Sequence, residues 1–495
     1  MLLDLLALGP SLLLAVAAVA VLLADAVASG PDFPPRTTWL APMCALVLAL
    51  SVGASLGRLG ADPRALLAGA LIDDDFSRAG AVLLSAAGFV AVLLSPIYAR
   101  HARIESGEYY ALLLISVVGL HVMVMAADFM TFFLGLETMS IAVYALTGMR
   151  ANDARASEAA LKYFIVGSFS TGFLLFGIAL LYGATGAVSY AALSAPTPAA
   201  GAADLLPLGL ALVFVGFAFK VAAVPFHMWA PDVYEGAPTP ITGFMAVAVK
   251  AGAFMALLRL VHAGGASLAS PAGLSLLSGL AAVTIVVGNA LALVQTSVKR
   301  MLAYSSISHA GYLLIGIVAA VKGEPTAAGG VFYYLSAYTF TTLGAFGVLT
   351  YLERAEGGAA PERFGAFAGL GFKYPRLGLA MIVFMVALAG MPPTGGFFGK
   401  LYVFSAALRA GDVGLALVGV AGSIVGVYYY LKVVVAFYMR EQPDPGPLPE
   451  ANPSRMLGLG LAAAVLATLL LGLVPSPWVR VGQSAGGALS AAVGE

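Results

Sequence analysis

Two stretches of the sequence decide the fold: FAFKVAAVPFHMWAPDVY at residues 217–234 and ALAGMPPTGGFFGK at residues 387–400. Each lies in a long apolar run, carries one lysine, and interrupts the run with proline or with proline and glycine. Proline removes a hydrogen-bond donor from a helix, and glycine loosens the helical backbone. We therefore predict two membrane-spanning helices that are broken at membrane depth, where protein or water meets the freed backbone groups.

The rest of the chain has the composition of an integral membrane protein. Of its 495 residues, 61% are hydrophobic and 10% are charged, whereas soluble domains are about 25% charged. Runs of about 20 apolar residues are long enough to cross a bilayer as helices, and strands of a β-barrel need only about 10 alternating residues. We predict an all-α protein with fourteen spans, at residues 3–27, 39–57, 79–98, 109–127, 129–149, 158–182, 205–230, 240–262, 271–293, 299–320, 327–351, 377–406, 413–439 and 456–474.

The two breaks fall in predicted spans 7 and 12, which are five spans apart. Because five is odd, a repeat of spans 4–8 in spans 9–13 is inverted across the membrane, and paired broken helices in inverted repeats are typical of transport sites. Prolines that merely kink two helices are the alternative. The predicted units are residues 1–108 (spans 1–3), 109–262 (first repeat), 263–440 (second repeat) and 441–495 (span 14 and tail).

The loops predict the orientation, because lysine and arginine gather in cytoplasmic loops. Odd-numbered loops carry thirteen of them and even-numbered loops, with the tail, carry seven, so both termini are predicted to lie outside the cytoplasm. The thirteen are Arg36, Arg100, Arg103, Arg150, Arg155, Lys299, Arg300, Arg354, Arg363, Lys373, Arg376, Arg440 and Arg455; the seven are Arg58, Arg64, Arg78, Arg259, Lys322, Arg409 and Arg480. The N-terminus lacks the basic region of a cleaved signal and is predicted to be the first span.

The same composition excludes several classes of function. Lys plus Arg and Asp plus Glu both number 25, so the chain has no basic footprint for nucleic acid. Its one cysteine, Cys44, allows no disulfide or cysteine-based metal site. Motifs for phosphate or dinucleotide binding are absent from the sequence. We expect no cofactor in this chain.

Charged residues inside the predicted spans are the candidates for chemistry. Insertion of a lysine at the centre of a span costs about 2.5–3.5 kcal/mol, and such residues usually mark ion or proton pathways. The strongest candidates for a proton relay are Glu137, Lys220, Lys250 and Lys400, and the weaker ones are Lys162, near the start of span 6, and Lys432 in span 13. A static ion pair, such as Glu137 with Lys220, is the alternative.

Two histidines extend this relay, because imidazole exchanges protons near neutral pH. His227 follows the break in span 7. His309 lies in span 10, and nearby hydroxyls were expected to hold a chain of water: Tyr304, Ser305, Ser306 and Ser308. A histidine satisfied by a backbone carbonyl is the alternative. His101, His121 and His262 are predicted at loops or helix ends with no role, and Asp232 and Glu235 are predicted either to gather protons or to be a solvated face.

Three motifs carry a family resemblance. VPFHMWAPDVYEGAPTPITGF (224–244), KRMLAYSSISHAGY (299–312) and GMPPTGGFFGK (390–400) resemble the antiporter-like membrane subunits of respiratory complex I, and HMWAPDVYEGAPTP is similar to the N-type form. The resemblance covers nearly the whole chain. It assigns the family's span 5 glutamate to Glu137 and its lysines to Lys220, Lys250, Lys400 and Lys162. A long lateral helix after span 14 is not expected, because only about 20 residues remain.

The resemblance implies fourteen helices with two inverted five-helix repeats, each with a discontinuous helix, and proton translocation driven by quinone reduction in neighbouring subunits. NADH, FMN, iron–sulfur clusters and quinone are then expected in other subunits. The implied partners are the M-type antiporter-like subunit, small K-, J- and A-type subunits, and membrane lipid. A subunit of a multisubunit cation/proton antiporter and a structural membrane scaffold are the competing interpretations.

Overall fold

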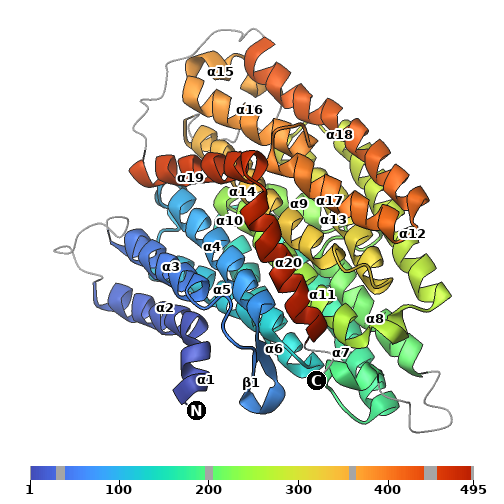
Figure 1. Ribbon diagram of the computed structural model, residues 1–495. Helices are drawn as coiled ribbons and strands as arrows, with labels where there is room; N and C mark the ends of the chain where they lie inside the picture. Colours follow the sequence, from blue (N-terminus) through green and yellow to red (C-terminus); the bar gives the residue numbers. More distant parts are fainter. Residues whose placement is uncertain (1, 29–38, 195–204, 356–363, 440–453, 492–495) are drawn as a thin grey trace.

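The structure is a computed structural model that describes residues 2–28, 39–194, 205–355, 364–439 and 454–491. It is a helical bundle with one short β-hairpin (Figure 1). The helices of the first half are α1 (Leu2–Ala7), α2 (Gly9–Val27), α3 (Leu40–Leu56), α4 (Asp75–His101), α5 (Gly107–Met125), α6 (Phe129–Thr147), α7 (Ala154–Thr185), α8 (Leu205–Lys220), α9 (Ala230–Gly236), α10 (Thr239–Phe244) and α11 (Lys250–Leu268). Those of the second half are α12 (Pro271–Leu293), α13 (Val298–Val321), α14 (Ala327–Ala355), α15 (Leu370–Lys373), α16 (Pro375–Ala389), α17 (Gly395–Arg409), α18 (Val413–Met439), α19 (Arg455–Leu473) and α20 (Ser476–Ala491).

Eleven of the described segments are long and apolar enough to cross a membrane, and α3, α8 and α16 are shorter apolar helices. All fourteen predicted spans therefore coincide with apolar helices, but length and composition do not confirm the count of fourteen. Short helical turns complete the described helical structure: 3-10 helices η2 (Leu67–Gly69), η3 (Tyr190–Ser194) and η6 (Phe364–Phe367), and a π-helix η5 (Met245–Val249) that joins α10 to α11.

Both predicted breaks are present. Helix α8 ends at Lys220, and the chain resumes as a helix only at Ala230. Helix α16 ends at Ala389, Gly390 takes a left-handed conformation with φ of 80°, and α17 begins at Gly395. A Cβ added at Gly396 would lie 1.9 Å from the carbonyl oxygen of Ala387, so glycine is required where the two half-helices approach most closely.

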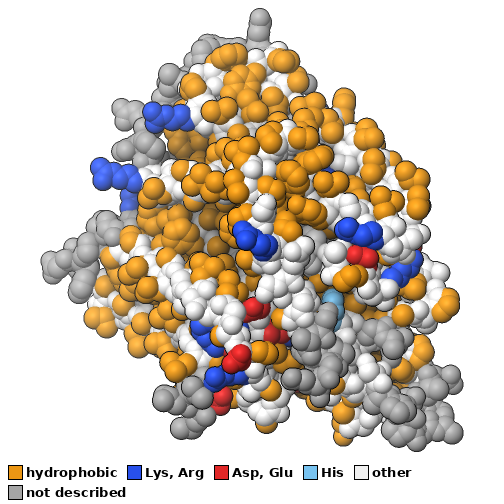
Figure 2. All heavy atoms as spheres, viewed as in Figure 1, with side chains coloured by type: hydrophobic (Ala, Val, Ile, Leu, Met, Phe, Trp, Pro, Cys, Tyr) orange, Lys and Arg blue, Asp and Glu red, His pale blue; other side chains and the backbone are white. Residues whose placement is uncertain are grey.

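The core consists of the segment α10–η5–α11 with α13 and α14. In these three segments 94–100% of the residues in the most apolar stretch are buried inside the protein. The corresponding share is 33–39% in α2, α7, α12, α18 and α19. The outer helices expose large apolar side chains such as Phe169 and Leu417, and hydrophobic side chains cover much of the face in Figure 2. This arrangement places an apolar wall toward lipid and encloses the helices that carry the buried lysines.

An unpredicted β-hairpin lies between α3 and α4. Strands β1 (Arg64–Leu66) and β2 (Leu71–Asp73) pair antiparallel, with Arg64 opposite Asp73. Directly after it, Asp74 caps α4 and also forms a two-pronged ion pair with Arg259 of α11, with both nitrogen–oxygen distances at 2.9 Å. Arg78 pairs with Asp73 at 3.0 Å. The buried ion pairs of this region lock α4 to the hairpin and to α11.

These contacts correct part of the predicted charge pattern. Arg78, Arg259 and Lys299 were counted as loop or helix-end charges, but all three side chains are buried and ion-paired. These three residues therefore give no evidence about which loops lie in the cytoplasm. Arg36, Arg363 and Arg440 lie outside the described residues.

Helix α20 occupies residues that were predicted only as a tail. It packs against α14 and α4 (Figure 1). Gly482 of α20 and Gly329 of α14 meet so closely that a Cβ on Gly482 would lie 2.9 Å from the Gly329 carbonyl oxygen. The Ser484 hydroxyl donates to Asp75 at 3.0 Å. Helix α20 therefore packs where α14 and α4 begin.

Candidate functional site

Three lysines lie buried inside the bundle: Lys220, Lys250 and Lys400 have exposed fractions of 3%, 2% and 5%. Each stands at an irregularity of a helix. Lys220 is the last residue of α8, Lys250 directly follows the π-helix η5, and Lys400 lies one turn into α17 after the second break. Helix breaks and π-helices leave backbone acceptors that a regular helix would use itself, and they occur often at functional sites.

Lys220 is held by hydroxyl groups. Its Nζ donates to Ser140 Oγ at 2.8 Å and to Tyr144 OH at 3.2 Å, both on α6. The carboxylate of Glu137 instead accepts from Thr171 at 2.8 Å and is only partly buried. The direct Glu137–Lys220 ion pair is therefore absent from the structure. Glu137 lies one helical turn before Ser140, so it stays close to the lysine along α6.

The described hydrogen bonds of Lys250 all go to Ser306 of α13. Its Nζ donates to the Ser306 hydroxyl at 2.6 Å and to the Ser306 carbonyl oxygen, and lies 5.6 Å from the centre of the Tyr338 ring. The serine carbonyl is within a helix and keeps a lone pair for the ammonium group. This lysine thus rests on neutral acceptors.

Lys400 closes the second break. Its Nζ donates to the carbonyl oxygens of Leu388 and Ala389, each at 3.0 Å, and to Ser423 Oγ at 2.8 Å. The two carbonyls end α16, where unpaired acceptors and the negative end of the helix dipole favour a cation. The break in the helix and the lysine therefore form one unit.

His309 lies between these lysines, fully buried on α13. Its Nε2 is 2.9 Å from Tyr430 OH, and its Nδ1 is 2.8 Å from Tyr334 OH. Tyr430 also hydrogen-bonds with Ser305. Ser308 donates to a backbone carbonyl, and the histidine is held by two tyrosines of other helices, so the predicted chain of water along these hydroxyls stays a prediction.

Three side chains on one face of α13 lie between Lys250 and Lys400, but none of the described hydrogen bonds joins one of the three to the next. Ser306, His309 and Tyr312 are spaced three residues apart, which places them on the same side of a helix. Ser306 binds Lys250 at one end, and the Tyr312 ring lies 5.3 Å from Lys400 Nζ at the other. Lys220 and Lys250 have no hydrogen-bond partner in common among the described side chains.

Lys162 belongs to a different place. Its side chain is 44% exposed and pairs with Glu158 at 2.7 Å and Asp232 at 2.9 Å. Arg300 joins the cluster by contacting Asp232 and Glu235, each at 2.8 Å. Partial burial raises the pKa of Asp232, but hydrogen bonds from Lys162 and Arg300 outweigh it and hold that pKa below its usual value. The cluster lines a surface pocket of about 310 Å³.

The two remaining candidates lie at the edges of the network. His227 is half-buried in the first break, and its Nδ1 is buried without a partner among the described residues. Lys432 donates to the carbonyl oxygen of Gln295 at 3.2 Å and lies 4.3 Å from the centre of the Phe364 ring. Neither joins the α13 face through a hydrogen bond that the structure describes.

A second buried charge cluster was not predicted from the sequence. Glu353 of α14 pairs with Lys299 of α13 at 2.5 Å, and the Thr239 hydroxyl lies within 2.7 Å of both carboxylate oxygens. Glu353 lies just after the predicted span 11, where a charged residue is expected to face water at the end of a membrane helix. His121 was also misplaced: it is buried in α5, between Ser11 at 3.1 Å and Ser85 at 3.0 Å.

Over the described residues, no group of three or more His, Cys, Asp or Glu side chains is arranged to hold a metal ion. The lysine, imidazole and hydroxyl groups of the network can exchange protons with one another and with any water admitted at the breaks.

The chain is similar to known membrane proteins. The family described as NADH:quinone oxidoreductase/Mrp antiporter, transmembrane, matches residues 126–426. A protein of Trichlorobacter lovleyi named NADH-quinone oxidoreductase subunit N is 45% identical over 410 residues, which is 82% of each chain. The matched segment contains both breaks and all three buried lysines.

Solved structures share the fold. A chain of respiratory complex I from Thermus thermophilus with bound aureothin is 36% identical, with a TM-score of 0.79 over 95% of this chain and 98% of that one. A chain of the Mrp complex from Dietzia is 22% identical, with a TM-score of 0.84 over 99% and 98% of the two chains. The second likeness, at that identity, shows the fold alone.

Proposed function

The chain belongs to the NADH:quinone oxidoreductase/Mrp antiporter family of membrane subunits, and we propose from this that it translocates protons in the membrane arm of a complex I-type enzyme. The observation that carries the proposal is the α13 face, where Ser306, His309 and Tyr312 lie between two buried lysines. Relatives named NADH-quinone oxidoreductase subunit N, 40–45% identical over most of the chain, support the type of complex.

The proposed transfer uses groups that exchange protons without a cofactor. A buried lysine can change its charge state, whereas arginine keeps its proton. His309 can accept a proton on one ring nitrogen and release one from the other, because its two nitrogens face different tyrosine hydroxyls. Since the lysines rest on neutral acceptors, a shift in a nearby charge changes how readily each one holds its proton.

Lys220 is the first site of this relay in the proposal, and Glu137 regulates it from the next turn of α6. The carboxylate is partly exposed on the chain's own surface, so a neighbouring subunit can reach it. Two charges about 4 Å apart interact by about 4 kcal/mol at an effective dielectric near 20, and the interaction falls with the inverse of the distance, so Glu137 acts on Lys220 most strongly when a movement brings the carboxylate closer. Moving such a charge is sufficient to change which lysine carries the proton. A water-filled gap is then needed between Lys220 and Lys250.

Partners and location follow from the family. We propose that the chain assembles with other membrane-arm subunits, among them M-type and small K-, J- and A-type neighbours. NADH, FMN, iron–sulfur clusters and quinone would bind in other subunits and not in this chain.

The protein is a multi-span protein that fits a bacterial inner membrane, and we propose that both termini face away from the cytoplasm. Omitting the three buried loop-end charges leaves twelve cations in odd loops against five in even ones.

A subunit of a multisubunit cation/proton antiporter is the second candidate, because the Dietzia Mrp chain shares the fold. The higher identity to subunit N relatives favours the complex I-type function. A static scaffold is disfavoured, because none of the three buried lysines forms a hydrogen bond with a carboxylate of the described chain.

Replacement of Lys250 by alanine tests the proposal. We expect the Lys250→Ala complex to assemble but to lose most quinone-linked proton pumping, because the buried amine that donates to Ser306 of the α13 face is then missing. Proton-to-electron ratio in membrane vesicles is the measurement, with native gels for assembly. The control is Lys322→Ala at the C-terminal end of α13, where the lysine pairs with Asp412 away from the relay. Equal pumping by both variants would refute the proposal.

A further inference from the structure

A long apolar groove opens between α16 and α19. It has a volume of about 820 Å³, near the upper end of the range of about 300–1,000 Å³ for small-molecule sites. Its floor includes Tyr351 of α14, and its walls are the first half of α16 and one face of α19. We call it the α16–α19 groove. None of the functional side chains described above lines it.

The length of the groove matches one leaflet of a bilayer. The lining positions of α19 run from Leu457 to Leu469, mostly at spacings of three or four residues, so they form one continuous helix face. At 1.5 Å per residue this face is about 18 Å long. Half of the hydrocarbon core is about 15 Å thick. Leu466 is 58% exposed there, so the apolar end of the groove is open to the side.

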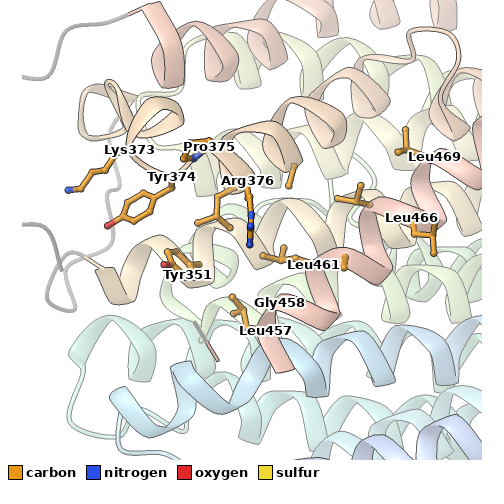
Figure 3. A pocket seen from close by; sticks show the side chains of 14 residues that line it. Tyr351, Lys373, Tyr374, Pro375, Arg376, Leu457, Gly458, Leu461, Leu466 and Leu469 are labelled. Atoms are coloured by element: carbon orange, nitrogen blue, oxygen red, sulfur yellow. The ribbon is translucent and has the colours of Figure 1, made fainter. Parts of the chain in front are cut away.

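The other end of the groove is basic. Lys373 and Arg376 line it, and of the fourteen lining residues none is acidic. Figure 3 shows Arg376 between Tyr351 and Leu461, Lys373 and Tyr374 at one end, and Leu466 and Leu469 at the opposite end. Among the described residues, neither Lys373 nor Arg376 forms an ion pair with a carboxylate.

Both groove helices begin at this basic end, α16 at Pro375 and α19 at Arg455. Their N-termini add positive potential to that of the side chains. Glu353, a buried acid two residues after Tyr351 in the sequence, is already paired with Lys299. An anionic group at this end would therefore meet cations that it can pair with, in a region where aromatic side chains also gather.

We propose that the α16–α19 groove binds an anionic phospholipid. Its phosphate group lies against Arg376 and Lys373, and its acyl chains lie along the Leu457–Leu469 face of α19. Charge at one end and an apolar wall of one leaflet's length fit a lipid better than a protein helix, which would need polar partners along its length. The lipid belongs to the leaflet on the side of the α14–α15 connection.

Photo-crosslinking in the assembled complex tests this proposal. The complex is placed in phosphatidylcholine vesicles that contain a trace of phosphatidylglycerol with a diazirine in its acyl chain, or of phosphatidylcholine with the same diazirine. Mass spectrometry then compares labelling of α19 with labelling of the exposed apolar face of α18 around Leu417. We expect the anionic probe to enrich α19 labelling several-fold over the zwitterionic probe.

A double variant, Lys373→Gln with Arg376→Gln, should lower that enrichment to the level of the zwitterionic probe. The matched control is Arg409→Gln, which removes an exposed arginine outside the groove and should leave the enrichment unchanged. Equal labelling by both probes would show an ordinary lipid-facing surface. Labelling of α18 without any labelling of α19 would show that another subunit covers the groove. Either result would overturn the proposal.

Discussion

At the scale of single residues, the neutral partners of the buried lysines distinguish a relay from a scaffold. A scaffold lysine is most stable against a fixed carboxylate, because one unpaired buried charge costs several kcal/mol. Lys250 and Lys400 are instead bound by serine hydroxyls and backbone carbonyls. These acceptors bind the charged amine, and a neutral amine can still donate hydrogen bonds to them after it loses its proton.

Tyr430 provides a prediction at this scale, because its hydroxyl joins His309 to Ser305. Tyr430→Phe removes the hydroxyl and keeps the ring, so we expect unchanged assembly with pumping reduced several-fold. The control is Tyr428→Phe on the same helix, whose side chain is 65% exposed. Proton uptake per quinone reduced would be measured in vesicles. Normal pumping by Tyr430→Phe would remove the tyrosine from the relay.

At the scale of elements, each broken helix combines a lysine with backbone N–H and C=O groups that lie outside the regular helical hydrogen-bond pattern. The two half-helices α16 and α17 meet where Gly396 passes the Ala387 carbonyl, and Lys400 then reaches back to Leu388 and Ala389. In the first break, the backbone N–H of Val224 donates to Thr284 at 3.1 Å, and Trp229 donates to the Phe219 carbonyl at 3.3 Å. Protein groups thus satisfy backbone atoms that a continuous helix would satisfy itself.

Substitution of Gly396 tests the geometry of the second break. A Cβ at this position would clash with backbone, so Gly396→Ala should force α17 away from α16 at a cost above the usual 1–3 kcal/mol of overpacking. We expect a lower melting temperature of the complex and loss of pumping. Gly279→Ala on α12 is the control, because nothing lies within 4 Å of its added Cβ. Equal stability of the two variants would contradict the described approach of the half-helices.

At the scale of the whole molecule, much of the architecture could be predicted from sequence, because apolar runs, prolines and buried lysines are local signals. The tyrosines around His309 could not, since Tyr334 and Tyr430 look like core residues until the helices are packed. Glu353 was missed because an acid near the end of a span is usually solvated. Helix α20 is amphipathic rather than apolar, so a search for spans passes over it. The proposed division at residues 108, 262 and 440 stays a prediction.

Orientation is testable at the same scale. An enzyme reporter that is active only outside the cytoplasm should be silent when it is inserted between α12 and α13 or between α14 and α15. It should be active when it is fused after residue 495. The reason is the excess of lysine and arginine in odd-numbered loops. Activity in the reverse pattern would invert the proposed membrane topology and place the basic end of the α16–α19 groove in the other leaflet.

The central claim is that buried lysines change their charge state during turnover. The most direct measurement is the proton-to-electron ratio of the Lys220→Arg complex in membrane vesicles, beside Lys220→Gln and a native-gel check of assembly. Arginine keeps a positive charge near Ser140 and Tyr144 but does not release its proton at working pH. The relay predicts that both variants assemble and that both lose most of their pumping. Full pumping by Lys220→Arg, with loss only in Lys220→Gln, would contradict the relay and leave Lys220 as a structural cation.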